Sequence, residues 1–203
     1  MKEEVGKTSN YMAVIAVIAC CDTKYHEISF VREKIKRSGN VPLILDISTG
    51  PNIPMEADIS RDRILENGGY TWEQIHDFDK SGAIFAMTES ISKTVMKLYR
   101  NGEMDGVIGM GGLQNTVVCS AALRLLPIGS RCFDTVVGDK DIAVMPSIVD
   151  FAGMNPISEA VLGNTVSAMI GMVSHGSRGI DTRGEMYIGA TLMGITNDTV
   201  MQA

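Results

Sequence analysis

The sequence predicts an α/β protein with a Rossmann-like parallel β-sheet and helices on both faces. Short runs of aliphatic and β-branched residues, typical of buried strands, alternate with longer segments in which apolar residues recur every three or four positions. Strands that are joined through helices run parallel, and right-handed crossovers place those helices on both faces of the sheet. The 203 residues are 45% hydrophobic and 21% charged, which excludes disorder and suffices for one large domain or two small ones.

The first three elements follow one another closely. Tyr11–Cys20 is an apolar, β-branched run that predicts a buried strand. Lys24–Ser38 predicts a helix ended by Gly39, with an apolar stripe made of Ile28, Val31 and Ile35. Val41–Ile47 predicts a second buried strand.

The next stretch is less regular. Thr49–Ile59 contains glycine and prolines and predicts a loop, after which Ser60 is placed to cap a short helix over Arg61–Glu66. Tyr70–Ser81 is polar and is expected to be irregular. Gly82–Arg100 carries the longest apolar stripe in the chain and predicts a long helix.

The second half continues the alternation. Gly106–Gly109 predicts a short strand and Asn115–Leu126 a helix. Val136-Val137 and Ile142–Met145 are candidates for short strands. Pro156–Val173 predicts an amphipathic helix with proline in its first turn.

The order of elements suggests a domain boundary near the end of the chain. We expect residues 1–180 to form an N-terminal Rossmann-like domain. Residues 181–203 are expected to form a linker and the first strand of a second domain, because Met186–Ile195 predicts a strand with no helix after it.

The apolar N-terminal run is interpreted as a strand rather than a signal. Val17–Cys20 resembles a lipoprotein cleavage box, but Glu3 and Glu4 precede the run where a signal peptide would be positively charged. About 20 apolar residues are needed to span a bilayer, and this run is shorter. We therefore expect no membrane segment and a cytoplasmic protein.

Composition argues against two classes of partner or cofactor. The net charge of −6 and an aromatic content of 5% argue against nucleic-acid binding. The cysteines and histidines stand at spacings that form no zinc signature: Cys20, Cys21, Cys119, Cys132, His26, His76 and His175. Buried thiols in a reducing cytoplasm are the favoured interpretation.

The sharpest local feature is a glycine-rich turn between a strand and a helix. Val107-Ile108 ends in Gly109, and Gly111 and Gly112 follow just before the next helix. Free backbone N–H groups and the dipole of a helix N-terminus favour a phosphate there. Neither nucleotide fingerprint is complete, since Gln114 replaces the third glycine of G-x-G-x-x-G. Phosphate binding and a purely structural turn both remain open.

Acidic residues follow other predicted strands. Asp22 and Thr23 either contact a ligand, together with Lys24, or cap the following helix. Asp139 either binds Mg²⁺ or belongs to a turn. Asp150 is either a site residue or a buried cap.

Five blocks occur in an order that resembles a known family: Asp22-Thr23-Lys24, Asp58-Ile59-Ser60, Asp105–Gly112, Leu126–Gly129 and Asp141–Ser158. The family is poorly characterised, has two domains, and shares this region with the ATP-binding N-terminal part of the tomato mosaic virus resistance protein. The resemblance implies two Rossmann-like halves, ATP bound near the cleft between them, and self-association as a homodimer or higher homo-oligomer.

The resemblance also implies a set of binding residues. ATP, with Mg²⁺, would be bound by Asp22, Thr23, Lys24, Gly109, Gly111, Gly112, Gln114, Asn115, Thr116 and Asp150, and Asp139 would bind the metal. The sequence departs from the family pattern in three places. Leu113–Thr116 stands where the family has Ser-Gly-Gly-Thr. The stretch from Gly129 to Val136 is too short for both the strand and the loop that follow in the family, so one of the two is expected to be missing. The sequence stops at Ala203, where Met186–Thr199 is expected to open the second domain.

Two rival functions remain open on sequence grounds. One is an enzyme that acts on a small carbonyl or sugar-acid substrate without nucleotide, with Lys24 or Lys140 as the base. The other is a non-catalytic regulatory or assembly module in which the glycine turn is structural.

Overall fold

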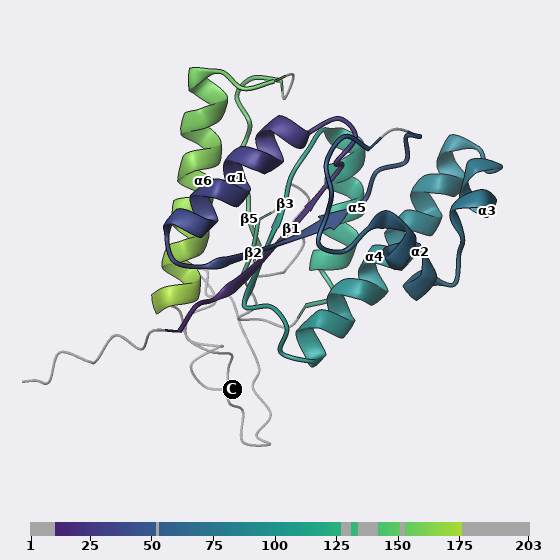
Figure 1. The fold of residues 1–203 in the computed structure, drawn as a ribbon, viewed down its shortest axis with the longest axis horizontal. Coiled ribbons are helices and arrows are strands. Elements are labelled where there is room, and N and C mark those ends of the chain that lie inside the picture. Colours follow the sequence, from purple (N-terminus) through teal and green to yellow (C-terminus); the bar gives the residue numbers. More distant parts are fainter. Residues whose placement is uncertain (1–10, 52, 127–130, 134–141, 151–152, 176–203) are drawn as a thin grey trace, which may run out of the picture.

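A computed structural model describes residues 11–51, 53–126, 131–133, 142–150 and 153–175. Its centre is a parallel sheet of five strands in the order β2-β1-β3-β4-β5, shown in Figure 1. The strands are β1 (Val14–Ala19), β2 (Val41–Asp46), β3 (Gly106–Gly109), β4 (Arg131–Phe133) and β5 (Ile142–Ala143). The predicted fold class, an α/β protein with a Rossmann-like parallel sheet, is confirmed.

The central strand is β1, which pairs with β2 on one side and β3 on the other. Every residue from Ile15 to Ala19 is fully buried, because helices cover both faces of the sheet. This explains why the strand is apolar throughout instead of alternating with polar residues.

Helices form a layer on each face of the sheet (Figure 1). α1 (Tyr25–Arg37) and α6 (Pro156–His175) pack on one face, around a core that includes Ile28 and Val166. The opposite face carries α2 (Arg61–Gly68), α4 (Lys80–Arg100) and α5 (Leu113–Leu123), whose apolar side chains form a second core cluster. The short helix α3 (Trp72–His76) lies beside α4.

Three elements differ from the sequence-based expectation. α3 lies within Tyr70–Ser81, which was expected to be irregular; it is too short to show a helical period, but Thr71 and Gln74 form a capping box that predicts its start. α5 begins at Leu113, two residues before the expected start at Asn115, and Gly112 is its N-cap. β4 is present, so the strand expected after Gly129 is not missing.

Other predictions fall outside the described residues. These are the candidate strand Val136-Val137, the linker and strand in 181–203, and the side chain of Asp139.

The segment before α6, within the sequence block Asp141–Ser158, caps that helix and ties it to α1. Asn155 accepts hydrogen bonds from the backbone N–H groups of Ile157 and Ser158 at 2.9 and 3.0 Å, which caps the helix N-terminus. Gly153 donates its backbone N–H at 3.0 Å to the carboxylate of Glu27, a side chain of α1 that is only 1% exposed. Much of this distinctive block therefore has a structural role.

α6 is also, by length and composition alone, the one helix in the described ranges that could cross a membrane. In the structure it lies against α1, β3 and β4, with Leu162, Val166 and Met169 buried. Apolar helices that cover a sheet meet the same criteria of length and composition.

The crossing of α2 and α4 requires glycine at position 68. A Cβ built there would approach the backbone Cα of Ser90 to 3.0 Å and collide with its side chain. We expect Gly68→Ala to destabilise the fold by about 1–3 kcal/mol through overpacking. Gly171→Ala, in the middle of α6 with open space around the new methyl group, is the matched control and should stabilise by up to about 1 kcal/mol. Urea unfolding of both variants measures the difference; equal effects would contradict the proposed close approach.

The buried carboxylate of Glu27 provides a second test. Glu27→Ala leaves the N–H of Gly153 without its acceptor and should lower the free energy of unfolding by about 1–3 kcal/mol. Glu27→Gln keeps a carbonyl oxygen at that position and should lose less. Urea unfolding distinguishes them, and an equal loss in both variants would show that the hydrogen bond to Gly153 contributes little.

Candidate functional site

The strand order places a crevice between the carboxyl ends of β1 and β3. After β1 the chain crosses to β2 on one side of β1, whereas β3 pairs with the other side of β1. The connections that follow β1 and β3 therefore lead away in opposite directions, which leaves a space between the carboxyl ends of the two strands. In doubly wound sheets ligands bind at such a switch point. The loops that meet here are Cys20–Lys24 and Met110–Gly112.

The glycine turn after β3 is shaped by two different requirements. Gly111 has a φ of +143°, and a Cβ at this position would approach the Cβ of Asn115 to 2.7 Å, so only glycine fits. Gly112 is the N-cap of α5 and provides no side chain to its N–H groups; a Cβ there would meet nothing within 4 Å. The first turn of α5 thus presents backbone donors to open space.

Asn115 and Thr116, both predicted to bind phosphate, support this turn from within. The Cys20 thiol donates to Oδ1 of Asn115 at 3.2 Å, which links the loop after β1 to α5. The Thr116 hydroxyl donates to the carbonyl of Gly112 at 3.1 Å. These contacts fix the position of the turn.

A hollow of about 560 Å³ lies over the first turn of α5, and we call it the basic hollow. It is lined by Thr23, Lys24, Lys80, Gly112, Leu113, Gln114 and Asn115. The structure therefore brings Thr23 and Lys24, which follow β1, together with Gly112, Gln114 and Asn115, which follow β3. It adds Lys80, the first residue of α4, which sequence reasoning missed because α4 was expected to begin at Gly82; Asp79 as a helix N-cap is the signal that could have found it.

A second hollow, of about 470 Å³, lies on the other side of the glycine turn, and we call it the apolar hollow. Its walls come from α1, β3 and the turn after it, the start of α5, the segment after β5, and α6: Val31, Ile108–Leu113, Thr116, Val144–Ile148, Val161, Leu162 and Thr165. Ile148 at its rim is 77% exposed and has a φ of +66°, which is rare for a β-branched residue. The apolar and basic hollows share Gly112 and Leu113, so the N-terminus of α5 lies between them.

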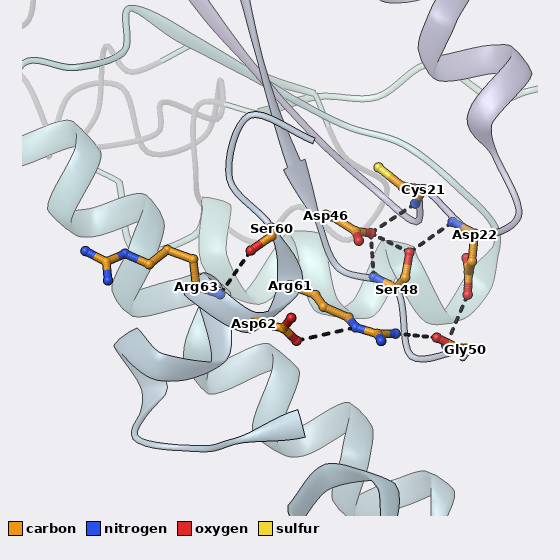
Figure 2. A network of polar contacts seen from close by, with 9 residues as sticks. All are labelled: Cys21, Asp22, Asp46, Ser48, Gly50, Ser60, Arg61, Asp62 and Arg63. Carbon is orange, nitrogen blue, oxygen red and sulfur yellow. Dashed lines mark hydrogen bonds and ion pairs between the residues drawn. The ribbon is translucent and has the colours of Figure 1, made fainter. Parts of the chain in front are cut away.

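A buried polar network supports the loops after β1 and β2 (Figure 2). The carboxylate of Asp46, 1% exposed, accepts hydrogen bonds from the N–H of Cys21 at 3.0 Å and the N–H of Ser48 at 2.9 Å, as well as from the Ser48 hydroxyl. The Ser48 oxygen in turn accepts the N–H of Asp22 at 3.0 Å. This network fixes the two loops relative to each other.

Asp22 holds the loop after β2 rather than the helix after β1. Its Oδ2 accepts the N–H of Gly50 at 3.1 Å, and the carbonyl of Gly50 accepts from the guanidinium of Arg61, as Figure 2 shows. α1 begins after Lys24 with no side-chain cap, so a capping role for Asp22 or Thr23 is wrong. The reason is geometric: the Asp22 carboxylate reaches across to the neighbouring loop. Its Oδ1 is buried without a hydrogen-bond partner among the described residues.

The thiols near the crevice are poor nucleophiles. Cys20, Cys21 and Cys119 are buried and form no disulfide among the described residues. Burial, reinforced by the Asp22 carboxylate, raises the pKa of Cys20 to about 12, and burial together with Asp46 also raises the pKa of Cys21. Both thiols therefore stay protonated at neutral pH, in agreement with the expected structural role.

Of the two aspartates predicted after the later strands, Asp139 lies outside the described residues and Asp150 does not reach the crevice. Asp150 is exposed and lines neither hollow. In the part of the chain that the structure describes, no three His, Cys, Asp or Glu side chains are close enough to share a metal ion. Mg²⁺ at this site would therefore depend on ligand oxygens and water more than on a protein cage.

Comparison with known proteins agrees with the resemblance found in the sequence. A UPF0261 protein of Mesorhizobium japonicum is 30% identical over 201 residues, which are 93% of this chain and 49% of that protein. A UPF0261 protein of Clostridium tetani is 29% identical over 198 residues, 92% of this chain and 48% of that protein. The ToMV resistance protein Tm-1(GCR237) of Solanum lycopersicum is 29% identical over 215 residues, 90% of this chain and 28% of that protein.

The chain thus spans about half the length of the bacterial relatives it matches. Residues 13–178, which include every described element from β1 to α6, match the model of the N-terminal domain of an uncharacterised protein family, UPF0261. This chain belongs to the UPF0261 family, as an N-terminal domain.

Proposed function

We propose that this domain binds a nucleotide, ATP, across the glycine turn after β3. The observation that carries the proposal is the basic hollow, in which the first turn of α5 meets Lys24 and Lys80. Unpaired N–H groups at a helix N-terminus and two lysines are the donors that a polyphosphate needs. The ATP-binding region implied by the sequence resemblance supports the same assignment.

The apolar hollow offers a place for the base. Met110, Val144, Met145, Ile148 and Leu162 give it an apolar lining of the kind that binds flat heterocycles. Because Gly112 and Leu113 border both hollows, a nucleotide could place its base on one side and its phosphates on the other. In this arrangement Asp22 is a positioning residue, since it holds the neighbouring loop through Gly50.

The proposal also includes a cytoplasmic location and self-association. Cytoplasmic location is supported by Cys20, Cys21 and Cys119, buried thiols that form no disulfide among the described residues. Self-association is supported by large apolar side chains left exposed on α4 and α5, namely Phe85, Leu113 and Val117.

Thermal unfolding of the 203-residue chain with ATP and Mg²⁺ tests the proposal directly. A nucleotide at a hundredfold excess over its Kd stabilises the folded state by about 2.7 kcal/mol, which raises the melting temperature by several degrees. Adenosine should give a smaller shift because it lacks the phosphates. The absence of any shift with ATP would overturn the proposal, and a shift with a sugar acid instead would favour the rival enzyme.

Gly112→Ala places a methyl group over the first turn of α5 without touching the protein. We expect it to cost about 0.5–1.5 kcal/mol of stability, since alanine is a poorer N-cap than glycine, and to weaken ATP binding at least about tenfold in the folded protein by blocking the phosphates. Isothermal titration measures the affinity. Gly171→Ala, far from the crevice on α6, is the matched control. Unchanged ATP affinity in Gly112→Ala would place the phosphates elsewhere.

Removing a lysine from the basic hollow should weaken ATP more than adenosine. We expect Lys24→Ala and Lys80→Ala each to raise the Kd for ATP roughly tenfold, the loss of one charge-assisted contact, while the Kd for adenosine changes little. The control is Lys36→Ala, an exposed lysine in the last turn of α1. Titrations at two salt concentrations should show a shallower salt dependence in the two test variants. Equal losses for ATP and adenosine would exclude a phosphate contact.

A further inference from the structure

A third hollow adjoins the basic hollow, and we call it the aromatic hollow. It has a volume of about 270 Å³ and is formed by the loop after β2, α3, the start of α4, and α5. It is lined by Thr49, Pro51, Trp72, Ile75, His76, Phe78, Lys80, Ala83, Ile84 and Gln114. Lys80 and Gln114 line the basic hollow as well, so the two spaces meet at these residues.

Contacts within the protein hold one wall of the aromatic hollow in place. The guanidinium of Arg61 lies 3.4 Å from the centre of the Trp72 ring and also donates to the carbonyl of Gly50. Arg61 is 8% exposed, and Gly50 is held from its other side by Asp22. Trp72 and the loop that carries Thr49 and Pro51 are therefore fastened to one buried cation. A fixed wall lowers the entropic cost of binding.

The polar side chains of the hollow carry a net positive charge. Lys80 makes no ion pair in the described part of the chain. The nearby acids Asp77 and Asp79 keep their negative charges, but neither lines the hollow, and Asp79 accepts the N–H of Gly82 at 2.8 Å. The ammonium of Lys80 is thus the charge available to a ligand, with the amide of Gln114 beside it.

We propose that the aromatic hollow binds a small organic carboxylate with an apolar body. Its carboxylate would lie at Lys80 and Gln114, and its apolar body against Trp72 and Phe78. A carboxylate has one negative charge and two acceptor oxygens, which one ammonium and one amide satisfy; a phosphate requires more donors. The volume lies below the range typical of drug-sized ligands, which indicates a small metabolite.

The position of this site gives it a relation to the proposed nucleotide. If ATP occupies the basic hollow, Lys80 contacts both anions and places the carboxylate next to the phosphates. This relation rests on the proposed function, whereas carboxylate binding itself does not.

The single tryptophan makes the inference directly measurable, because Trp72 is the only one in the chain. The probe is cyclohexanecarboxylate, which has an apolar body and does not absorb in the tryptophan range, and the matched uncharged probe is cyclohexanecarboxamide. We expect a saturable change in Trp72 fluorescence with the carboxylate at up to roughly 10 mM, ten times a Kd of 1 mM, and at least about tenfold weaker binding of the amide. No saturable change, or an equal response to the amide, would overturn the proposal.

Two variants separate this site from the nucleotide site. Ala83→Leu fills the aromatic hollow alone and should abolish the carboxylate response while the Kd for ATP stays within about twofold. Lys80→Ala should weaken both ligands about tenfold, and Lys36→Ala neither. A carboxylate response that survives Ala83→Leu in a folded protein would overturn the proposal. A carboxylate response without ATP binding would overturn the proposed function and leave this inference standing.

Discussion

The carboxylate of Asp46 is the contact on which the functional edge of this domain depends. It is buried at the end of β2 and accepts three hydrogen bonds, two from Ser48 and one from the N–H of Cys21. All three reach its Oδ1, and such bonds offset the cost of burying a carboxylate. The loops after β1 and β2 must therefore keep one relative position, and Asp22, Gly50 and Arg61 extend that constraint to α2 and Trp72.

The crevice that results has a consistent chemical order along the edge of the sheet. The apolar hollow lies between α6 and the glycine turn, the basic hollow lies over the start of α5, and the aromatic hollow lies beside α3. The N-terminus of α5 lies between the first two, and Lys80 joins the second to the third. Family membership leaves the reaction open, so the proposals on ligands depend on this arrangement.

Sequence reasoning located the crevice because the carboxyl ends of parallel strands share one edge. It correctly brought Lys24 near Gly112, although they are far apart in the chain. It could not find Lys80 or Glu27, whose roles depend on where α4 begins and on how α1 packs against the segment before α6. It could not decide whether the Asp150 carboxylate is buried, because a carboxylate after an apolar run looks the same in sequence whether it is exposed or not.

The junction of two hollows would also set a length requirement on the proposed nucleotide. The apolar and basic hollows share Gly112 and Leu113, so a molecule that occupied both would have to cross the N-terminus of α5, with its apolar and anionic ends on opposite sides. Under the proposed function, the distance between the two ends of a ligand would then matter independently of any single contact.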